Sequence, residues 1–133
     1  MAVKPIPDGY QTVVPYLIVT GAEALIEFLK DAFGATERMH VPGPNGAIMH
    51  AEMQLGDSVI MLADASAEVQ VRTAMLHLYV VDVDGSYKRA LAAGGASIRE
   101  PADQTYGDRT AAVKDRWGKE WWLATHIKDV AHA

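Results

Sequence analysis

The sequence predicts an α+β fold in which two tandem β-α-β-β-β modules form a single domain. The length of 133 residues fits one compact domain. Strand and helix patterns occur in the same order in both halves of the chain, and comparison of the chain with itself pairs the halves without a gap. We therefore expect a first module at residues 12–64, a connector at 65–74 and a second module at 75–126.

The first module begins with a β-branched and aromatic run that predicts a strand at residues 12–19. A helix is expected at residues 22–33, ended by Gly34. Its apolar residues recur at helical spacing: Leu25, Ile26, Leu29 and Phe33. Turn residues at 42–46 and at Gly56-Asp57 then separate three further strands. These strands are expected at residues 36–41, 47–55 and 58–62.

The second module repeats this order of elements. A strand is expected at residues 75–81 and a helix at 83–93, which Asp82 opens as its N-cap and Gly94-Gly95 ends. Three strands follow, at residues 96–100, 109–114 and 120–125.

An internal duplication explains this repeated order. At an offset of 61 residues, identities exceed the roughly one pair in thirteen that composition alone gives. They fall at equivalent points of strand, helix and stop: Leu17/Leu78, Val19/Val80, Ala32/Ala93, Gly34/Gly95, Ala35/Ala96, Arg38/Arg99, Gly46/Gly107, Ala51/Ala112, Leu62/Leu123 and Ala63/Ala124. Chance matching of alanines is the alternative.

Composition excludes several functions. Without cysteine, the chain has no disulfide, zinc-thiolate site, iron-sulfur cluster or thiol nucleophile. A net charge of -5, with the twelve Lys and Arg spread along the chain, argues against nucleic acid as a partner. Neither a signal peptide nor an apolar run of about 20 residues is apparent, so we expect a cytoplasmic protein without a membrane partner.

Several short motifs, in this order and spacing, resemble the PhnB-like branch of the vicinal oxygen chelate superfamily, which includes glyoxalase I, bleomycin-resistance proteins and extradiol dioxygenases. They are Val14-Pro15-Tyr16-Leu17, Ala32-Phe33-Gly34-Ala35, Met49-His50-Ala51-Glu52, the run from Gly56 to Asp64, Leu76-His77-Leu78-Tyr79-Val80, Tyr106-Gly107-Asp108-Arg109, Asp115-Arg116-Trp117-Gly118 and Ala124-Thr125-His126. The resemblance implies a curved mixed sheet around a cleft. It also implies a homodimer, with exchange of modules in some members.

The resemblance also implies where a metal would be held. Its ligand positions, on the first and fourth strands of each module, map here onto Val14, Met61, Met75 and Trp122. None of these side chains is a plausible ligand for a hard or borderline divalent cation. We therefore expect neither a metal nor another cofactor, and an apolar floor that suits an apolar or aromatic ligand. The alternative is that the four residues simply fill the cleft as core.

Strand alternation identifies the polar groups around this floor. Met49, Ala51, Met53 and Leu55 form a row suited to packing under a helix, which leaves Ile48, His50, Glu52 and Gln54 for the cleft. On a strand, His50 and Glu52 are about 7 Å apart at Cα, so their contact depends on side-chain reach. The polar candidates for the cleft are Tyr16, His50, Glu52, Gln54, His77, Tyr79, Arg109, Glu120 and His126.

Three functional hypotheses follow. The first is a protein that binds a small apolar or aromatic molecule through Tyr16, His50, Glu52, Met61, Met75, His77, Tyr79, Arg109 and Trp122. The second is a lyase, isomerase or dioxygenase that uses His50, Glu52 or His77 as acid/base groups or as relocated metal ligands. The third is an interaction domain without a ligand. Arg109, which the offset aligns with Ile48, can bind an anionic group or pair with Asp108, Glu52 or Glu120.

Overall fold

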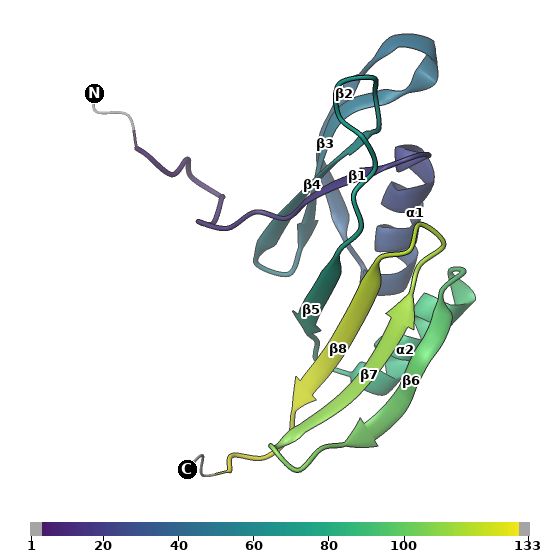
Figure 1. Cartoon of the computed structure of the whole chain (residues 1–133). Coiled ribbons are helices and arrows are strands. Elements are labelled where there is room, and N and C mark those ends of the chain that lie inside the picture. Colours follow the sequence, from purple (N-terminus) through teal and green to yellow (C-terminus); the bar gives the residue numbers. More distant parts are fainter. Residues whose placement is uncertain (1–3, 131–133) are drawn as a thin grey trace. The chain divides into compact units, whose positions relative to one another are not determined.

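The computed structural model describes residues 4–130. Its elements follow the order β-α-β-β-β twice, which confirms an α+β fold made of two tandem modules (Figure 1). By its internal contacts the chain divides into two compact units. The first contains the chain up to Lys30 together with Gly34–Arg72, and the second contains Asp31–Phe33 together with the chain from Thr73 onward. The module boundaries drawn from the sequence stay predictions.

The first sheet has the strand order β1-β4-β3-β2, with β1 parallel to β4 and the other pairs antiparallel. The elements of this module are β1 (Tyr16–Val19), α1 (Ala22–Phe33), β2 (Thr36–Pro42), the short 3-10 helix η1 (Pro44–Gly46), β3 (Ile48–Leu55) and β4 (Ser58–Asp64). The helix has its expected bounds, and Gly34 ends it in the left-handed conformation with φ of 70°.

The strand expected at residues 12–19 is only half formed, because β1 begins at Tyr16. Pro15 has no N–H to donate, although its carbonyl accepts a hydrogen bond from the Met61 N–H. Further upstream, the side-chain amide of Gln11 takes the place of a backbone: it donates to the Val59 carbonyl at 2.8 Å and accepts from the Val59 N–H at 3.1 Å. The segment before β1 is thus attached to the sheet by a side chain.

The second sheet repeats this topology in the order β5-β8-β7-β6, with β5 parallel to β8. Its elements are β5 (Met75–Tyr79), α2 (Val83–Ala92), β6 (Ala96–Asp103), β7 (Asp108–Lys114) and β8 (Glu120–His126). Asp82 caps α2 as expected, since its side chain accepts a hydrogen bond from the Gly85 N–H. Neither helix of residues 4–130 has the length and apolar character needed to cross a bilayer.

One face of the first sheet, here called the core face, is buried where β1, β4 and the centre of β3 form it, whereas β2 is exposed along its length. Together with the apolar side of α1, the core face forms the core of the first unit through Leu17, Val19, Ala51, Met53 and Leu62. The opposite face, here called the site face, carries Tyr16, Ile18, Glu52, Met61 and Ala63. The alternation expected for β3 therefore holds over its central residues.

The alternation is wrong for Met49 at the start of β3. Met49, expected under the helix, is 61% exposed, whereas Ile48, expected on the side of the cleft, is 2% exposed and lines a pocket on this unit. The pairing of β2 with β3 shifts between Val41 and Pro42, so that the ladder passes from His50 to Ile48 and skips Met49. An unpaired residue of this kind ends regular alternation.

The two modules do not align at a constant offset of 61. Tyr16 pairs with Met61, and 61 positions later His77 pairs with Trp122. However, Met61 also pairs with Glu52, whereas Trp122 pairs with Ala112, which follows Glu52 by 60 positions. The segment between the first strand and the last hairpin is one residue shorter in the second module, and the span from Ala112 to Trp122 is one residue longer than that from Glu52 to Met61, so β6 and β7 are shifted by one. The left-handed Gly34 accordingly corresponds to Gly94, not to Gly95.

Asp64, the last residue of β4, and Thr125, the residue before the last of β8, have the same role in the two modules. Gly21 precedes α1 without a side-chain cap. Asp64 supplies the acceptor instead: one carboxylate oxygen accepts from the N–H groups of Gly21 and Ala22, each at 2.9 Å, and the other accepts from Ile48 N–H at 2.8 Å. In the second module, Thr125 accepts from the Val83 N–H at 3.0 Å. A strand end thus fixes each helix start.

We expect Asp64→Ala to lower the free energy of unfolding by about 2–3 kcal/mol, because three backbone N–H groups lose a charged acceptor. Burial acts to raise the pKa of Asp64, but these three hydrogen bonds outweigh it and the pKa lies below its usual value. The contribution is thus full above the pKa of the unfolded chain and is lost as pH falls through the lower folded pKa. Urea denaturation across this acidic range measures both effects. Asp57→Ala, in the exposed turn before β4, is the control.

Candidate functional site

Four side chains of the first unit form a continuous chain of hydrogen bonds on and above the site face. The Tyr16 hydroxyl lies 2.8 Å from His50 Nδ1, and His50 Nε2 lies 2.8 Å from a carboxylate oxygen of Glu52. The other oxygen of Glu52 accepts from the Tyr10 hydroxyl. The contact between His50 and Glu52, which the sequence left to side-chain reach, is therefore made directly.

The strand register explains why these residues meet. Tyr16 on β1 and Glu52 on β3 both pair with Met61 of the strand between them, so all three side chains lie on the same face. His50 is two residues before Glu52 on β3 and shares that face. The Tyr16 and His50 rings are 5.6 Å apart between centroids. Because the polar residues come from two strands, neither strand alone reveals the chain of hydrogen bonds.

Glu52 is a charged group in a covered position, with 3% of its surface exposed. Burial acts to raise its pKa, but the hydrogen bonds from His50 and Tyr10 outweigh burial, and the positive charge of Arg38 acts in the same direction. The pKa of Glu52 therefore lies below its usual range. At neutral pH this residue is a carboxylate, which accepts hydrogen bonds and donates none.

The segment before β1 covers Glu52, and this role for Tyr10 was not predicted from the sequence. Tyr10 donates to the carboxylate, and the Arg38 guanidinium lies 4.7 Å from the centre of the Tyr10 ring. Arg38 also donates to the Gly9 carbonyl at 2.8 Å and to Gln54 Oε1 at 3.2 Å. No local pattern marks Tyr10, because its partner is 42 positions away.

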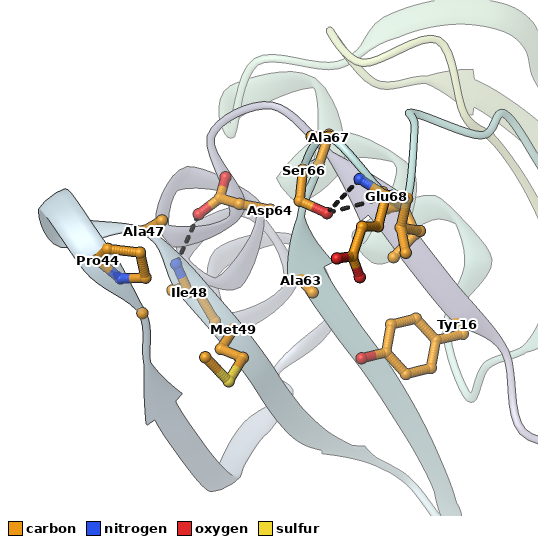
Figure 2. Close-up of a pocket in the computed structure, with 14 residues that line it drawn as sticks. Tyr16, Pro44, Ala47, Ile48, Met49, Ala63, Asp64, Ser66, Ala67 and Glu68 are labelled. Carbon is orange, nitrogen blue, oxygen red and sulfur yellow. Dashed lines mark hydrogen bonds between the residues drawn. The ribbon is translucent and has the colours of Figure 1, made fainter.

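A pocket of about 840 Å3 opens on the first unit beside the chain of hydrogen bonds (Figure 2). Tyr16 and Ile18 of β1, the turn before β3, the end of β4 and the loop after it form its walls. Most of its lining is apolar: Ile18, Pro44, Ala47, Ile48, Met49, Ala63, Ala65, Ala67 and Val69. The polar side chains of the lining are Tyr16, Asp64, Ser66 and Glu68. Tyr16 thus belongs both to the pocket and to the hydrogen-bond chain.

The loop after β4 was expected only as a connector, yet it forms one wall of this pocket. Ser66 shapes it: its hydroxyl accepts from the Glu68 and Val69 N–H groups at 3.3 and 3.1 Å, and its own N–H donates to the Val69 carbonyl at 2.8 Å. A serine that binds backbone groups two and three residues ahead is a recognisable local signal. It could have predicted a turn here, although not a pocket wall.

Two of the predicted floor residues, Met75 and Trp122, lie on the second sheet together with two of the polar candidates, His77 and Tyr79. Met75, His77 and Tyr79 of β5 are exposed, and Trp122 of β8, which pairs with His77, is partly exposed on the same face. The His77 and Tyr79 rings are 4.9 Å apart between centroids, and the Arg99 guanidinium lies 5.1 Å from the Trp122 ring. Glu52 has no counterpart here, because the register places Ala112 at its position.

Arg109 lies on the opposite face from the one the offset predicted. It pairs with Thr125, the residue that binds the start of α2, and its guanidinium binds Asp84 of α2 at 2.8 and 3.0 Å and Asp103 at 3.0 Å. Its salt-bridge partners differ from the three carboxylates that were considered. The one-residue shift of β7 is the physical reason, because such a shift turns every side chain of a strand to the other face.

Val14, mapped as a metal-ligand position, precedes β1, whereas the mapped Met61 lies on β4 between Tyr16 and Glu52. Within residues 4–130, no group of three or more His, Asp or Glu side chains is arranged to hold a metal ion. The pair formed by His50 and Glu52 offers one nitrogen and one carboxylate, and both are engaged in the hydrogen-bond chain.

We expect Tyr10→Phe to raise the pKa of Glu52, because one of the two hydrogen bonds that offset burial would be lost while the one from His50 and the charge of Arg38 remain. Loss of this hydrogen bond should also lower the free energy of unfolding. Titration of the Glu52 carboxyl carbon by NMR measures the pKa. Tyr106→Phe, a change at an exposed tyrosine, serves as the control, and an unchanged Glu52 titration in Tyr10→Phe would contradict the assignment.

Comparison with known proteins agrees with this architecture. Residues 10–123 match the model of the glyoxalase/bleomycin resistance protein/dioxygenase superfamily. An uncharacterized protein of Mycobacterium bovis is 34% identical over 127 residues, an alignment that spans 87% of this chain and 84% of the relative.

Solved structures share the fold. The structure of TioX from Micromonospora sp. ML1 has a TM-score of 0.74 at 24% identity and covers 88% of this chain and 99% of its own. That of TnmS3, an antibiotic binding protein from Streptomyces sp. CB03234, has a TM-score of 0.68 at 21% identity, with 95% and 98% covered. At these identities the likeness concerns the fold alone. The family match over most of the sequence goes further: the chain belongs to the glyoxalase/bleomycin resistance protein/dioxygenase superfamily.

Proposed function

We propose that the protein binds a small, largely apolar or aromatic molecule and does so without a metal. The observation that carries this proposal is the pocket of about 840 Å3, whose lining is mostly apolar and contains few polar groups. Binding sites for small molecules commonly have this composition, because apolar walls supply affinity and a few polar groups fix orientation. The likeness in fold to TnmS3, an antibiotic binding protein, supports a binding role.

Within this proposal, Tyr16 contacts the ligand, and Ile18, Ile48 and Met49 provide apolar surface around it. Met49 supports the assignment in particular, because 61% of a large apolar side chain is exposed beside the cavity. Methionine adapts its shape to different ligands. Of the predicted floor, Met61 lies between Tyr16 and Glu52 on the site face. We retain the floor residues Met75 and Trp122 and the neighbouring His77 and Tyr79 of the second sheet as proposed binding residues.

The chemistry of the mapped ligand positions supports binding without a metal. Val14 has no donor atom, the indole of Trp122 is not a metal ligand, and the thioethers of Met61 and Met75 suit only soft ions. His50 and Glu52 are already used by Tyr16 and Tyr10. A metal at this pair would have to replace both contacts.

The proposal also states the branch of the superfamily, the oligomeric state and the cellular compartment. The motifs around Tyr16, His50 and His77 support a place in the PhnB-like branch. The resemblance supports a homodimer, because members of the superfamily commonly dimerise, some of them by exchanging modules. We place this binding function in the cytoplasm.

A lyase, isomerase or dioxygenase is the second candidate, and one observation favours it. A buried carboxylate that orients a histidine, which in turn contacts a hydroxyl beside a pocket, is an arrangement used in acid/base catalysis. His50 and Glu52 would have that role here, with His77 of the second module as a further candidate. Recovery of the bound molecule separates the two functions, because binding leaves it unchanged and catalysis converts it.

We expect Met49→Asp to weaken binding of uncharged aromatic molecules by at least about tenfold, since a carboxylate in the apolar wall would have to be desolvated. Fluorescence titration with 2-naphthol and an anthraquinone measures the effect. Met39→Asp is the matched control, because Met39 is also an exposed methionine of the first sheet but does not line the pocket. Equal losses in the two variants, or saturable binding of none of the molecules by the unaltered protein, would contradict the proposal.

Dialysed protein is expected to contain transition metal only far below one equivalent, and its ligand affinity should not change when a chelator is added. Inductively coupled plasma mass spectrometry measures the metal content. A stoichiometric metal that is lost in His50→Ala or His77→Ala would show that metal-free binding is wrong.

A further inference from the structure

The Tyr16 hydroxyl has two neighbours, the pocket and His50. Tyr16 lines the pocket, where its ring extends over the sheet (Figure 2), and 45% of the residue is exposed. A phenol has one proton to donate and lone pairs that accept. What Tyr16 offers to a ligand therefore depends on the direction of its hydrogen bond with His50.

Glu52 determines that direction. As a carboxylate it can only accept, so His50 must donate from Nε2 to make the 2.8 Å contact. In a neutral imidazole the proton on Nε2 leaves Nδ1 as an acceptor. The Tyr16 hydroxyl, 2.8 Å from Nδ1, then donates its proton to His50. Tyr16 faces the pocket with its lone pairs only.

The surroundings of Tyr16 likewise favour a pocket wall that accepts hydrogen bonds. Burial, and to a lesser degree the negative charge of Glu52, raise the pKa of Tyr16, so the residue stays a neutral phenol at neutral pH. The other ionisable side chains of the lining are the carboxylates of Asp64 and Glu68, and no Lys, Arg or His is among its residues. A ligand with a hydrogen-bond donor matches these acceptors, whereas an anion would be repelled.

We infer that the pocket selects apolar or aromatic molecules that carry a hydroxyl or N–H donor, which binds the Tyr16 oxygen, and that Glu52 and His50 set this preference. The inference rests on the proposed function, because it specifies the class of ligand that the same pocket takes. Tyr16 contacts the ligand. His50 and Glu52 are positioning residues that act through Tyr16.

Two probes of nearly equal size test the inference with the full chain. 2-Naphthol has a hydroxyl donor, and its methyl ether, 2-methoxynaphthalene, has an acceptor at the same place. At neutral pH we expect 2-naphthol to bind about three- to tenfold more tightly than the ether, which is the range for one net hydrogen bond. Tyr16→Phe removes a single, partly exposed oxygen and should abolish the preference while leaving binding of the ether intact.

Glu52→Gln provides a second readout that loss of structure alone cannot mimic. Tyr10 would still donate to the amide oxygen, which directs the amide nitrogen toward His50 Nε2. The imidazole proton would then lie on Nδ1 and be donated to the Tyr16 oxygen, so the Tyr16 proton would turn toward the pocket. We expect the ether to gain affinity and the preference for 2-naphthol to disappear, because both probes carry an oxygen that can accept from Tyr16. Glu37→Gln is the matched control, because Glu37 pairs with His40 at 3.2 Å outside the pocket lining.

The outcomes separate this inference from the proposed function. Equal binding of the two probes, or a preference that survives in Tyr16→Phe, overturns the inference and leaves the binding function standing. Failure of both probes to bind the unaltered protein overturns the binding function as well. A Glu52→Gln variant that is folded, as judged by circular dichroism, but keeps the original preference shows that Glu52 does not set the direction.

Discussion

The buried carboxylate of Glu52 is the constraint on which the candidate site depends. A charge in a covered position has to be matched by donors, because desolvation otherwise costs several kcal/mol. Tyr10 and His50 supply these donors, one from the segment before β1 and one from β3 itself. The same requirement keeps Tyr10 over the sheet, fixes the proton on His50 Nε2 and thereby determines what the Tyr16 hydroxyl presents to the pocket.

A second carboxylate, that of Asp64, connects the elements that form the pocket. Asp64, at the end of β4, binds the first N–H groups of α1 and the Ile48 N–H at the start of β3. It also lines the pocket, so the residue that joins strand, helix and turn contributes to the site wall. Thr125 has the corresponding place in the second module with a hydroxyl. The duplicated fold thus keeps the contact that starts the helix and varies its chemistry.

The two modules have diverged in side-chain chemistry more than in topology. Tyr16 corresponds to His77 and Met61 to Trp122, but the register places Ala112 where the first module has Glu52. The hydrogen-bond chain is therefore a property of the first module alone. Aromatic rings and the Arg99 guanidinium occupy the corresponding face of the second sheet. A single chain can in this way offer two different surfaces from one repeated plan.

The sequence by itself determined the order of elements, both helices with their Gly34 and Asp82 ends, and the inward row of Ala51 and Met53. These features follow from local periodicity and local caps. It also identified Tyr16, His50 and Glu52 as candidates from alternation and motif position. The spacing of His50 and Glu52 on one strand was enough to make their contact conceivable.

Only the tertiary structure decided which distant residues meet. Tyr10 reaches Glu52 across 42 positions, and Asp64 reaches Gly21 across 43, so no local pattern contains either pair. The offset of 61 placed Arg109 on the wrong face, because one residue fewer between the first strand and the last hairpin of the second module shifts β6 and β7 by one position. A strand alternates with a period of two, and a change of one residue far upstream is therefore sufficient to exchange its faces.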